Sequence, residues 1–375
     1  MTYFINKKII NNSFTEAYNS DYFVDKTELI SKISKLISTN SKFLCITRPR
    51  RFGKTINAMM LESYYSKNAN SKEIFDKLNI SKCNSYEKHL NKHNMIYITF
   101  NNNASSCKTY EEYIDYYITG IIDDIKELWP DIEIKRKLSD ILEQIQSKTG
   151  ERFIFIIDEW DYIYNNNLFS KEDRDKYLLF LKDLLKDRPY VELCYMTGVL
   201  PIPKYCIGSA LNMFDEYNFL NDNIYYKYYG FTTEEVEHIC NQQDKVTMED
   251  LKEWYNGYKI QDIDLYNPIS VVSALTRGIC QSYWTNTGPV YEVPYLLNHN
   301  FNDTQNDVIK MLAGEKLYIQ LDDFDTGKLS LNTKFDIFSA MFVYGLLTYH
   351  DGVLEIPNKE IKLKFVKSLR NEYMK

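Results

Sequence analysis

Long apolar runs are missing from this 375-residue sequence. No stretch approaches the ~20 consecutive apolar residues that a membrane-spanning helix needs. The first residues, MTYFINKKIINNS, also lack the apolar core of a secretory signal peptide. The sequence therefore predicts a cytoplasmic protein that makes no use of a membrane.

Paired cysteines and surplus positive charge are missing as well. The seven cysteines are scattered and never spaced C-x-x-C, which argues against both a zinc site and disulfides. The net charge is −7, so the chain as a whole does not attract nucleic acid, which proteins bind through Lys and Arg. A local basic patch is still compatible with this composition.

The most informative segment runs from Phe43 to Thr55 and reads FLCITRPRRFGKT. An apolar, strand-like run leads into a basic loop and then into Gly53-Lys54-Thr55, the second half of the phosphate-binding pattern G-x-x-x-x-G-K-[ST]. Such a loop offers free backbone N–H groups and the positive end of a helix dipole to a triphosphate. Lys54 would neutralise the β- and γ-phosphates, and Thr55 would offer its hydroxyl to Mg²⁺. Arg48 holds the first glycine position, so the pattern alone is a half match.

A second segment, FIFIIDE from Phe153 to Glu159, supplies acidic partners. Five apolar residues predict a buried strand that ends in Asp158 and Glu159. Ligands bind at the carboxyl ends of strands in an open α/β sheet, so Asp158 would hold Mg²⁺ through water and Glu159 would polarise the attacking water. Each segment alone has a structural alternative, a turn before a helix or a core strand with a solvated end. Their order and strand context together favour a nucleotide site.

These segments resemble the bacterial AAA-ATPase-like family, which is often fused to a PD-(D/E)XK nuclease domain of the DUF1703 type. The resemblance extends over almost the whole chain. Its motifs are YFVDKT from Tyr22 to Thr27, RPRRFGKT from Arg48 to Thr55, IIDEWD from Ile156 to Asp161, TGVLPIPKY from Thr197 to Tyr205, SALNMF from Ser209 to Phe214, GFTTEEV from Gly230 to Val236, WYNGY from Trp254 to Tyr258, YNPISV from Tyr266 to Val271, YWTNT from Tyr283 to Thr287 and IPNKE from Ile356 to Glu360. Arg-Pro-Arg-Arg is the normal form of the loop in that family, so Arg48 does not argue for an inactive site.

The resemblance implies ATP as the nucleotide and further site residues. In AAA+ and STAND proteins the segment before the first core strand closes over the adenine, which makes Tyr22, Phe23 and Asp25 candidates; the alternative is that Asp25 caps a helix with Glu28. Thr197 stands where such proteins carry a sensor of the γ-phosphate; the alternative is that it starts a turn.

The identity of a charge-stabilising finger is left open among Lys204, Arg48, Arg50 and Arg51. The predicted site is then as follows: catalytic, Glu159, Lys54 and Thr197; nucleotide-binding, Arg50, Arg51, Phe52, Gly53, Lys54, Thr55 and Asp25; metal-binding, Thr55 and Asp158. His89 and His93 have a spacing that can bind metal, but a solvated helix face is the preferred interpretation.

Alternating strands and helices predict an α/β fold with a parallel sheet, and the resemblance implies a P-loop core of the AAA+/STAND type. Helices are expected at 26–38, 55–66, 110–129, 132–148 and 171–186, and strands at 95–100, 153–157 and 191–196. Thr232 with Glu235 and Thr247 with Asp250 predict the starts of two helices. The resemblance implies that these helices belong to a lid. Two helices, a hairpin at 347–356 and a helix at 359–373 suggest a winged-helix-like module. The expected domains are an ATPase core at 1–220, a helical lid at 221–290 and this module at 291–375.

The predicted function is Mg²⁺-dependent ATP binding and hydrolysis in a nucleotide-controlled switch that acts with a DNA-processing or defence partner. The alternative is a nucleotide-binding scaffold that hardly hydrolyses ATP and recruits a protein or DNA. A third hypothesis is DNA binding through Lys362 and Lys367 of the closing helix. No strand-borne Asp followed by E-x-K occurs after Glu360, so no nuclease activity is expected of this chain. A homo-oligomer is left open.

Overall fold

Five parallel strands form the main sheet of the protein. The computed structural model describes residues 3–7, 11–101, 106–135, 137–166, 168–203, 210–284, 302–321, 331 and 333–373. The strands lie in the order β2 (Asn94–Thr99), β3 (Phe153–Asp158), β4 (Val191–Gly198), β1 (Phe43–Thr47) and β5 (Asp215–Tyr217). Each neighbouring pair is parallel. The α/β class and the parallel sheet predicted from the sequence are therefore confirmed.

By its contacts the described chain divides into two units. The first unit comprises Met1–Thr47, Lys54–Gly198 and Ile202–Tyr217, and the second comprises Arg48–Gly53, Val199–Pro201 and Asn218–Lys375. The predicted boundary at 290 lies outside the described residues. The division into three domains remains a prediction.

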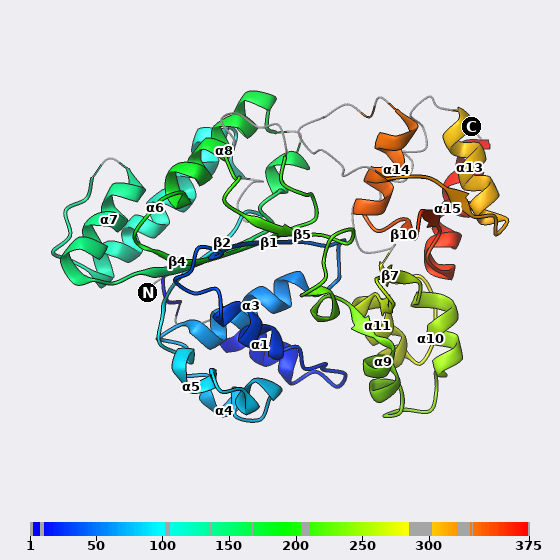
Figure 1. Cartoon of the computed structure of the whole chain (residues 1–375), viewed down its shortest axis with the longest axis horizontal. Coiled ribbons are helices and arrows are strands. Elements are labelled where there is room, and N and C mark those ends of the chain that lie inside the picture. Colours follow the sequence, from blue (N-terminus) through cyan, green and yellow to red (C-terminus); the bar gives the residue numbers. More distant parts are fainter. Residues whose placement is uncertain are drawn as a thin grey trace. The chain divides into compact units, whose positions relative to one another are not determined.

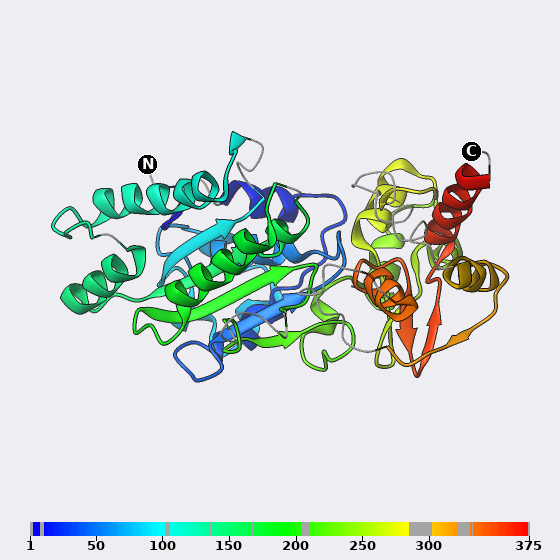
Figure 2. The same ribbon diagram turned by 90° about the horizontal axis from the view of Figure 1, so that it is seen from above.

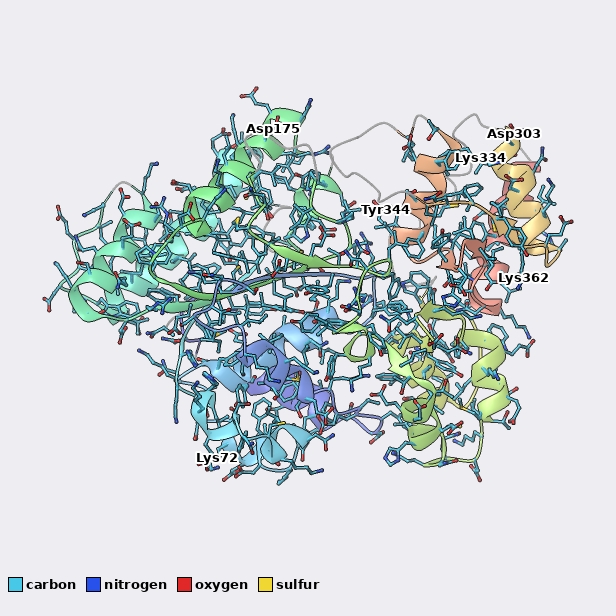
Figure 3. The ribbon with its side chains drawn as sticks, in the orientation of Figure 1. Lys72, Asp175, Asp303, Lys334, Tyr344 and Lys362 are labelled. Atoms are coloured by element: carbon cyan, nitrogen blue, oxygen red, sulfur yellow. The ribbon has the colours of Figure 1, made fainter. Side chains whose placement is uncertain are left out.

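Helices cover both faces of the sheet in the first unit (Figure 1). One face carries α1 (Asn11–Tyr18), α3 (Lys54–Tyr65), α4 (Lys72–Phe75) and α5 (Tyr86–His89), and the other carries α6 (Tyr110–Leu128), α7 (Leu138–Thr149) and α8 (Lys171–Leu185). Seen from above, α8 lies over the strands (Figure 2). Lys72 on α4 and Asp175 on α8 project from the two opposite faces (Figure 3). Because both faces are covered, the strands are buried and read as continuous apolar runs.

Shorter elements complete the first unit. They are α2 (Glu28–Ser34) and the 3₁₀ helices η1 (Asn79–Lys82) and η3 (Tyr162–Tyr164). The predicted helix 26–38 is present in shortened form as α2. The helix expected at 132–148 begins only at Leu138, and the Glu133 N–H, ahead of that start, donates to the Gln144 side chain at 2.9 Å.

The exposed edge of β2 is covered by the N-terminal segment. Ile5 forms an antiparallel bridge with Ile96, and the Tyr97 N–H donates to the Phe4 carbonyl at 3.0 Å. The buried Asp124 carboxylate on α6 accepts the backbone N–H groups of Phe4 and Ile5 at 2.6 and 2.8 Å. These contacts protect an edge that would otherwise invite pairing with another chain.

Among its described residues, the second unit contains two small antiparallel sheets and several helices. Its elements are η5 (Tyr226–Tyr228), β6 (Phe231–Thr232), α9 (Thr233–Cys240), α10 (Met248–Tyr255), β7 (Tyr258–Ile260), β8 (Ile263–Tyr266), α11 (Pro268–Arg277), α13 (Asn302–Leu312), β9 (Leu317–Tyr318), α14 (Lys334–Val343), β10 (Thr348–His350), β11 (Val353–Glu355) and α15 (Lys359–Tyr373). The sheets have the orders β6-β8-β7 and β10-β11-β9. Across the described residues, no helix is long and apolar enough to cross a membrane.

The expected lid helices begin where the sequence placed them. Capping boxes join Thr232 to Glu235 at α9 and Thr247 to Asp250 at α10. The region also contains the sheet β6-β8-β7, which the sequence did not indicate, because strands of two to four residues are too short to show a period of two. The region expected to form a helical lid is therefore mixed rather than purely helical.

The C-terminal part has the winged-helix-like arrangement expected from the sequence. The hairpin β10-β11 turns at Asp351 and Gly352, as predicted, and β9 pairs antiparallel with β11. The buried Glu360 carboxylate at the start of α15 accepts from the Ser270 hydroxyl at 2.7 Å and the Tyr283 N–H at 2.6 Å. This carboxylate ties α15 to α11 and to the segment that follows α11 within the second unit.

Candidate nucleotide-binding site

Four strand ends lie side by side at the carboxyl edge of the main sheet. Thr99 of β2 pairs with Asp158 of β3, Asp158 pairs with Thr197 of β4, and Thr197 pairs with Ile46 of β1. Ligands of open α/β sheets bind at this edge. The strands of the two segments that were predicted to bind a nucleotide therefore end close together at this edge of the sheet.

Lys54 and Thr55 begin α3 and meet the acidic end of β3. Lys54 is 7% exposed and Asp158 is 1% exposed. Burial raises the pKa of Asp158, while a hydrogen bond from Thr55 and the charge of Lys54 act in the opposite direction. The structure thus brings together the three residues expected to bind phosphate and metal.

Glu159 follows Asp158 in a backbone conformation that is uncommon for a residue with a side chain. Its φ is 52°, in the left-handed region, and such residues gather at functional sites. Burial raises the pKa of Glu159, the carboxylates of Asp158 and Asp161 raise it further, and Lys54 opposes them. Glu159 is therefore a partly buried carboxylate that lies among the charges of Asp158, Asp161 and Lys54.

Asn101 is a site residue that the sequence analysis missed. Its side chain hydrogen-bonds the Glu159 carboxylate, and the Thr99 hydroxyl donates to Asn101 Oδ1 at 3.0 Å. That second bond leaves the amide NH₂ to donate to Glu159. Asn101 lies just beyond β2 and belongs to no motif, so only its position at the end of an expected strand could have indicated it.

Asp161 is a third carboxylate in this group, and the sequence indicated no role for it beyond its place in the motif IIDEWD. It is 3% exposed and contributes to the raised pKa of both Asp158 and Glu159. A Cβ on Gly198 would collide with the Asp161 carboxylate and would come within 2.7 Å of the Trp160 indole nitrogen. Gly198 therefore lets the end of β4 approach the acidic segment.

Thr197 uses its hydroxyl within the sheet. The side chain is fully buried and Oγ1 donates to the Ile46 carbonyl at 2.9 Å. This geometry favours a structural role for Thr197 over a sensor that donates to a phosphate. The turn expected as the alternative is wrong, because Thr197 and Gly198 both belong to β4.

Asp25 also makes structural hydrogen bonds. Its carboxylate accepts from the Thr27 N–H at 2.8 Å, the Thr27 hydroxyl at 2.6 Å and the Asn79 N–H at 2.7 Å. The N-cap of α2 is Thr27, which makes no capping bond with its side chain, so the expected capping pair of Asp25 and Glu28 is wrong. The Phe23 ring packs edge-on against Tyr18 with 5.5 Å between centroids. A contact of this segment with adenine remains a prediction.

The phosphate loop, residues 48–53, is grouped with the second unit. Arg51 and Gly53 have φ of 70° and 84°, and turns that include left-handed residues form anion-binding concavities of backbone N–H groups. Among the described residues, no atom outside Gly53 and its two neighbours in the chain lies within 4 Å of the place of a Cβ on Gly53. Phe52 is buried, Arg50 is half-buried and Arg51 is exposed.

Of the four finger candidates, Arg48 is unsuited to that role. Its side chain is 0% exposed and forms an ion pair with the equally buried Asp222. Lys204 lies outside the described residues. Arg50 and Arg51 remain candidates.

His89 and His93 do not lie on a solvated helix face, so that interpretation is wrong. His89 Nδ1 lies 3.0 Å from His93 Nε2, and His93 Nδ1 lies 2.8 Å from Glu192 Oε2. Burial lowers the pKa of His89 to about 4. In the part of the chain that the structure describes, no group of three or more His, Cys, Asp or Glu could hold a metal ion.

Comparison with known proteins identifies the family. The model of the AAA-ATPase-like family, described as "Predicted AAA-ATPase", matches residues 9–208. The chain belongs to the AAA-ATPase-like family. The matched residues include the phosphate loop, Lys54, Thr55, Asp158 and Glu159.

The individual proteins and solved structures that match this chain have low sequence identity to it. An uncharacterized protein in the vnfD 5' region of Azotobacter chroococcum mcd 1 is 24% identical over 371 residues, which cover 94% of this chain and 67% of that protein. The Walker-type ATPase PABY2304 of Pyrococcus abyssi is 11% identical, with a TM-score of 0.47 over 92% of this chain and 94% of that one. The ORC2 protein of Aeropyrum pernix, solved as ADPNP-ADP complexes, is 10% identical, with a TM-score of 0.40 over 97% and 95%. The family membership of this chain rests on the family model and not on these structures.

Proposed function

We propose that this protein is a Mg²⁺-dependent P-loop ATPase that works as a nucleotide-controlled switch. The observation that carries the proposal is the meeting of Lys54 and Thr55, at the start of α3, with the buried Asp158 and with Glu159 at the end of β3. A helix N-terminus, an ammonium and a carboxylate at one sheet edge are the parts that bind and transfer a phosphoryl group.

The residues present fit a magnesium nucleotide. Mg²⁺ takes few protein ligands, prefers oxygen and keeps several waters, and the Thr55 hydroxyl and Asp158 carboxylate are adjacent oxygen donors. These two residues would hold the ion, which when bound would neutralise charge between the β- and γ-phosphates. The open space beside Gly53 leaves room for phosphate to approach the loop backbone.

Lys54 would counter the charge that spreads over the phosphate oxygens as the bond breaks. Glu159 would orient the attacking water and draw its proton, and the raised pKa of Glu159 brings it closer to the range in which a carboxylate is an effective base. Asn101 would fix the direction of the Glu159 carboxylate. Most of the catalysis would therefore come from positioning and electrostatics.

Two substitutions test this proposal. Lys54→Ala should abolish Mg²⁺-ATP binding in calorimetry, and Glu159→Gln should retain binding while phosphate release falls by a factor of about 100 or more. Lys72→Ala on α4 and Glu111→Gln on α6 remove exposed residues of the same types and should match the unaltered chain. Equal phosphate release by Glu159→Gln and the unaltered chain would contradict the catalytic role.

The hydrogen bond from Asn101 to Glu159 supports a second candidate, a nucleotide-binding scaffold with little turnover. A carboxylate held by an amide is less free to accept a proton from water. In that case the unaltered chain would bind ATP, lose binding in Lys54→Ala and release no phosphate that Glu159→Gln could reduce.

The partner of the switch is proposed to be a protein or DNA that contacts the C-terminal part. Most side chains of α14 are buried, which does not favour this helix as a reader of base edges. Lys362 and Lys367 are exposed on α15 (Lys362 in Figure 3) and could contact phosphates without reading sequence. We also propose a cytoplasmic location and leave a homo-oligomer as a hypothesis.

A further inference from the structure

We propose that the buried Arg48–Asp222 ion pair makes the phosphate loop part of the second unit, so that binding of a nucleoside triphosphate is transmitted to residues 219–230 through Arg48 and Phe52. This inference rests on the proposed function and specifies how that site is regulated. Arg48 and Asp222 are positioning residues here, because they act through the loop and not on the reacting atoms.

Arg48 stands where phosphate loops usually have glycine, and its side chain points into the second unit. Arg48 and Asp222 are both 0% exposed in their side chains and form a direct ion pair. The guanidinium also lies over the rings of Phe219 and Tyr229, 5.2 Å from each centroid. A buried guanidinium with a carboxylate and two aromatic faces has little freedom to move without the loop.

Asp222 also holds the backbone of the residues that follow it in the sequence. Its Oδ2 pairs with Arg48, while its Oδ1 accepts the N–H groups of Ile224 at 2.9 Å and Tyr225 at 2.7 Å. One carboxylate therefore connects the first residue of the loop to the turn that leads into η5. Loss of this charge would release the loop and the turn together.

Phe52 provides a second and independent connection near the other end of the loop. Its fully buried ring packs edge-on against Phe219 and Tyr258, with centroids 5.3 and 5.0 Å away. Its carbonyl accepts the Gly230 N–H at 3.1 Å. Gly230 has φ of 94°, and a Cβ there would lie 3.1 Å from the Phe52 ring. Gly230 thus allows the segment before β6 to close on the loop.

The loop continues directly into Lys54, so the backbone that would cradle phosphate is held in place by the second unit. Binding that orders the loop must then order residues 219–230. By thermodynamic linkage, if nucleotide binding favours the ordered form of this segment by a given factor, the ordered form favours nucleotide binding by the same factor. The second unit would report whether the phosphate site is filled, as a switch requires.

The experiment combines hydrogen exchange with affinity measurements on the full chain. In the unaltered chain, a non-hydrolysable ATP analogue with Mg²⁺ should slow exchange at the amides of Ile224, Tyr225 and Gly230 about tenfold or more. Asp222→Asn, which keeps the shape and removes the charge, should raise the Kd for the analogue about tenfold, equivalent to ~1.4 kcal/mol. Arg48→Lys keeps the charge and should restore part of the affinity relative to Arg48→Met.

Asp183→Asn is the matched control. Asp183 pairs with Arg188 at 2.8 Å in the first unit, and its substitution should leave the Kd unchanged. If the analogue binds but exchange at the three amides is unaltered, or if folded Asp222→Asn binds normally, the inference is overturned and the proposed function stands. If Asp222→Asn does not fold, exchange in the unaltered chain decides. If the unaltered chain binds no nucleotide, the proposed function and this inference both fail.

Discussion

Replacement of Glu62 by Gln should change how the stability of the protein depends on pH. Glu62 is 4% exposed, on the helix that begins with Lys54. It forms an ion pair with Lys7, with 3.9 Å between Nζ and Oε1. Burial raises the pKa of Glu62 from 4.5 to about 7, against the opposing effect of Lys7.

The sign follows from the raised pKa. Below about pH 4.5 Glu62 is protonated in both the folded and the unfolded chain, so it imposes no penalty. Between about 4.5 and 7 the unfolded chain releases the proton and the folded chain retains it, so the free energy of unfolding falls as pH rises. Each pKa unit corresponds to ~1.4 kcal/mol, which gives a loss of about 3 kcal/mol by pH 8.

Urea unfolding followed by circular dichroism between pH 4.5 and 8 measures this effect. The Glu62→Gln variant should lack the decline and should exceed the unaltered chain in stability at pH 8 by up to about 3 kcal/mol, with no comparable gain at pH 4.5. Lys7→Met is the companion variant. Since the charge of Lys7 lowers the pKa of Glu62, its removal should leave the start of the decline near pH 4.5 and extend the decline to higher pH. Parallel pH profiles for Glu62→Gln and the unaltered chain would refute the reasoning.

Two further predictions concern buried hydrogen bonds. Thr197→Val should lower the free energy of unfolding by about 1 kcal/mol, because the bond from the Thr197 hydroxyl to the Ile46 carbonyl is lost. ATP turnover of this variant, measured by phosphate release, should stay within a few-fold of that of the unaltered chain. A hundredfold loss of turnover would instead establish contact of Thr197 with the γ-phosphate. Glu360→Gln should destabilise the second unit by about 2 kcal/mol or more in denaturant unfolding, because the Glu360 carboxylate accepts from Ser270 and Tyr283 and an amide cannot replace both bonds equally. An unchanged unfolding midpoint for Glu360→Gln would contradict the structural role of that carboxylate.

Much of the site could be predicted from the sequence because its main signals are local. Lys54 and Thr55 follow an apolar strand and a short loop, and Asp158 and Glu159 end another apolar strand. Helix starts such as Thr232 were predicted correctly because a capping box needs residues only three positions apart. In each case neighbouring residues carry the whole physical signal.

The misjudged residues have long-range partners. Arg48 was considered for a role at the phosphates, yet its partner Asp222 lies 174 positions along the chain. The hydrogen bond of His93 to Glu192 spans 99 positions, so a spacing of four in the sequence could not show that this histidine is mostly buried. Asp25 was expected to cap α2 with Glu28, but its carboxylate accepts the N–H of Asn79, which lies far along the chain.

By itself, the sequence determined the sheet class, the beginning of α3 and the two acidic residues at the end of the third strand, because strand and helix patterns arise from adjacent side chains and the backbone. Only the tertiary structure decided that Asn101 reaches Glu159, that Asp161 lies against Gly198 and that Arg48 turns toward Asp222. Those contacts depend on strand order and on which distant segments pack together. The burial of apolar surface over the whole chain decides which segments pack together, and this leaves no periodic pattern in the sequence.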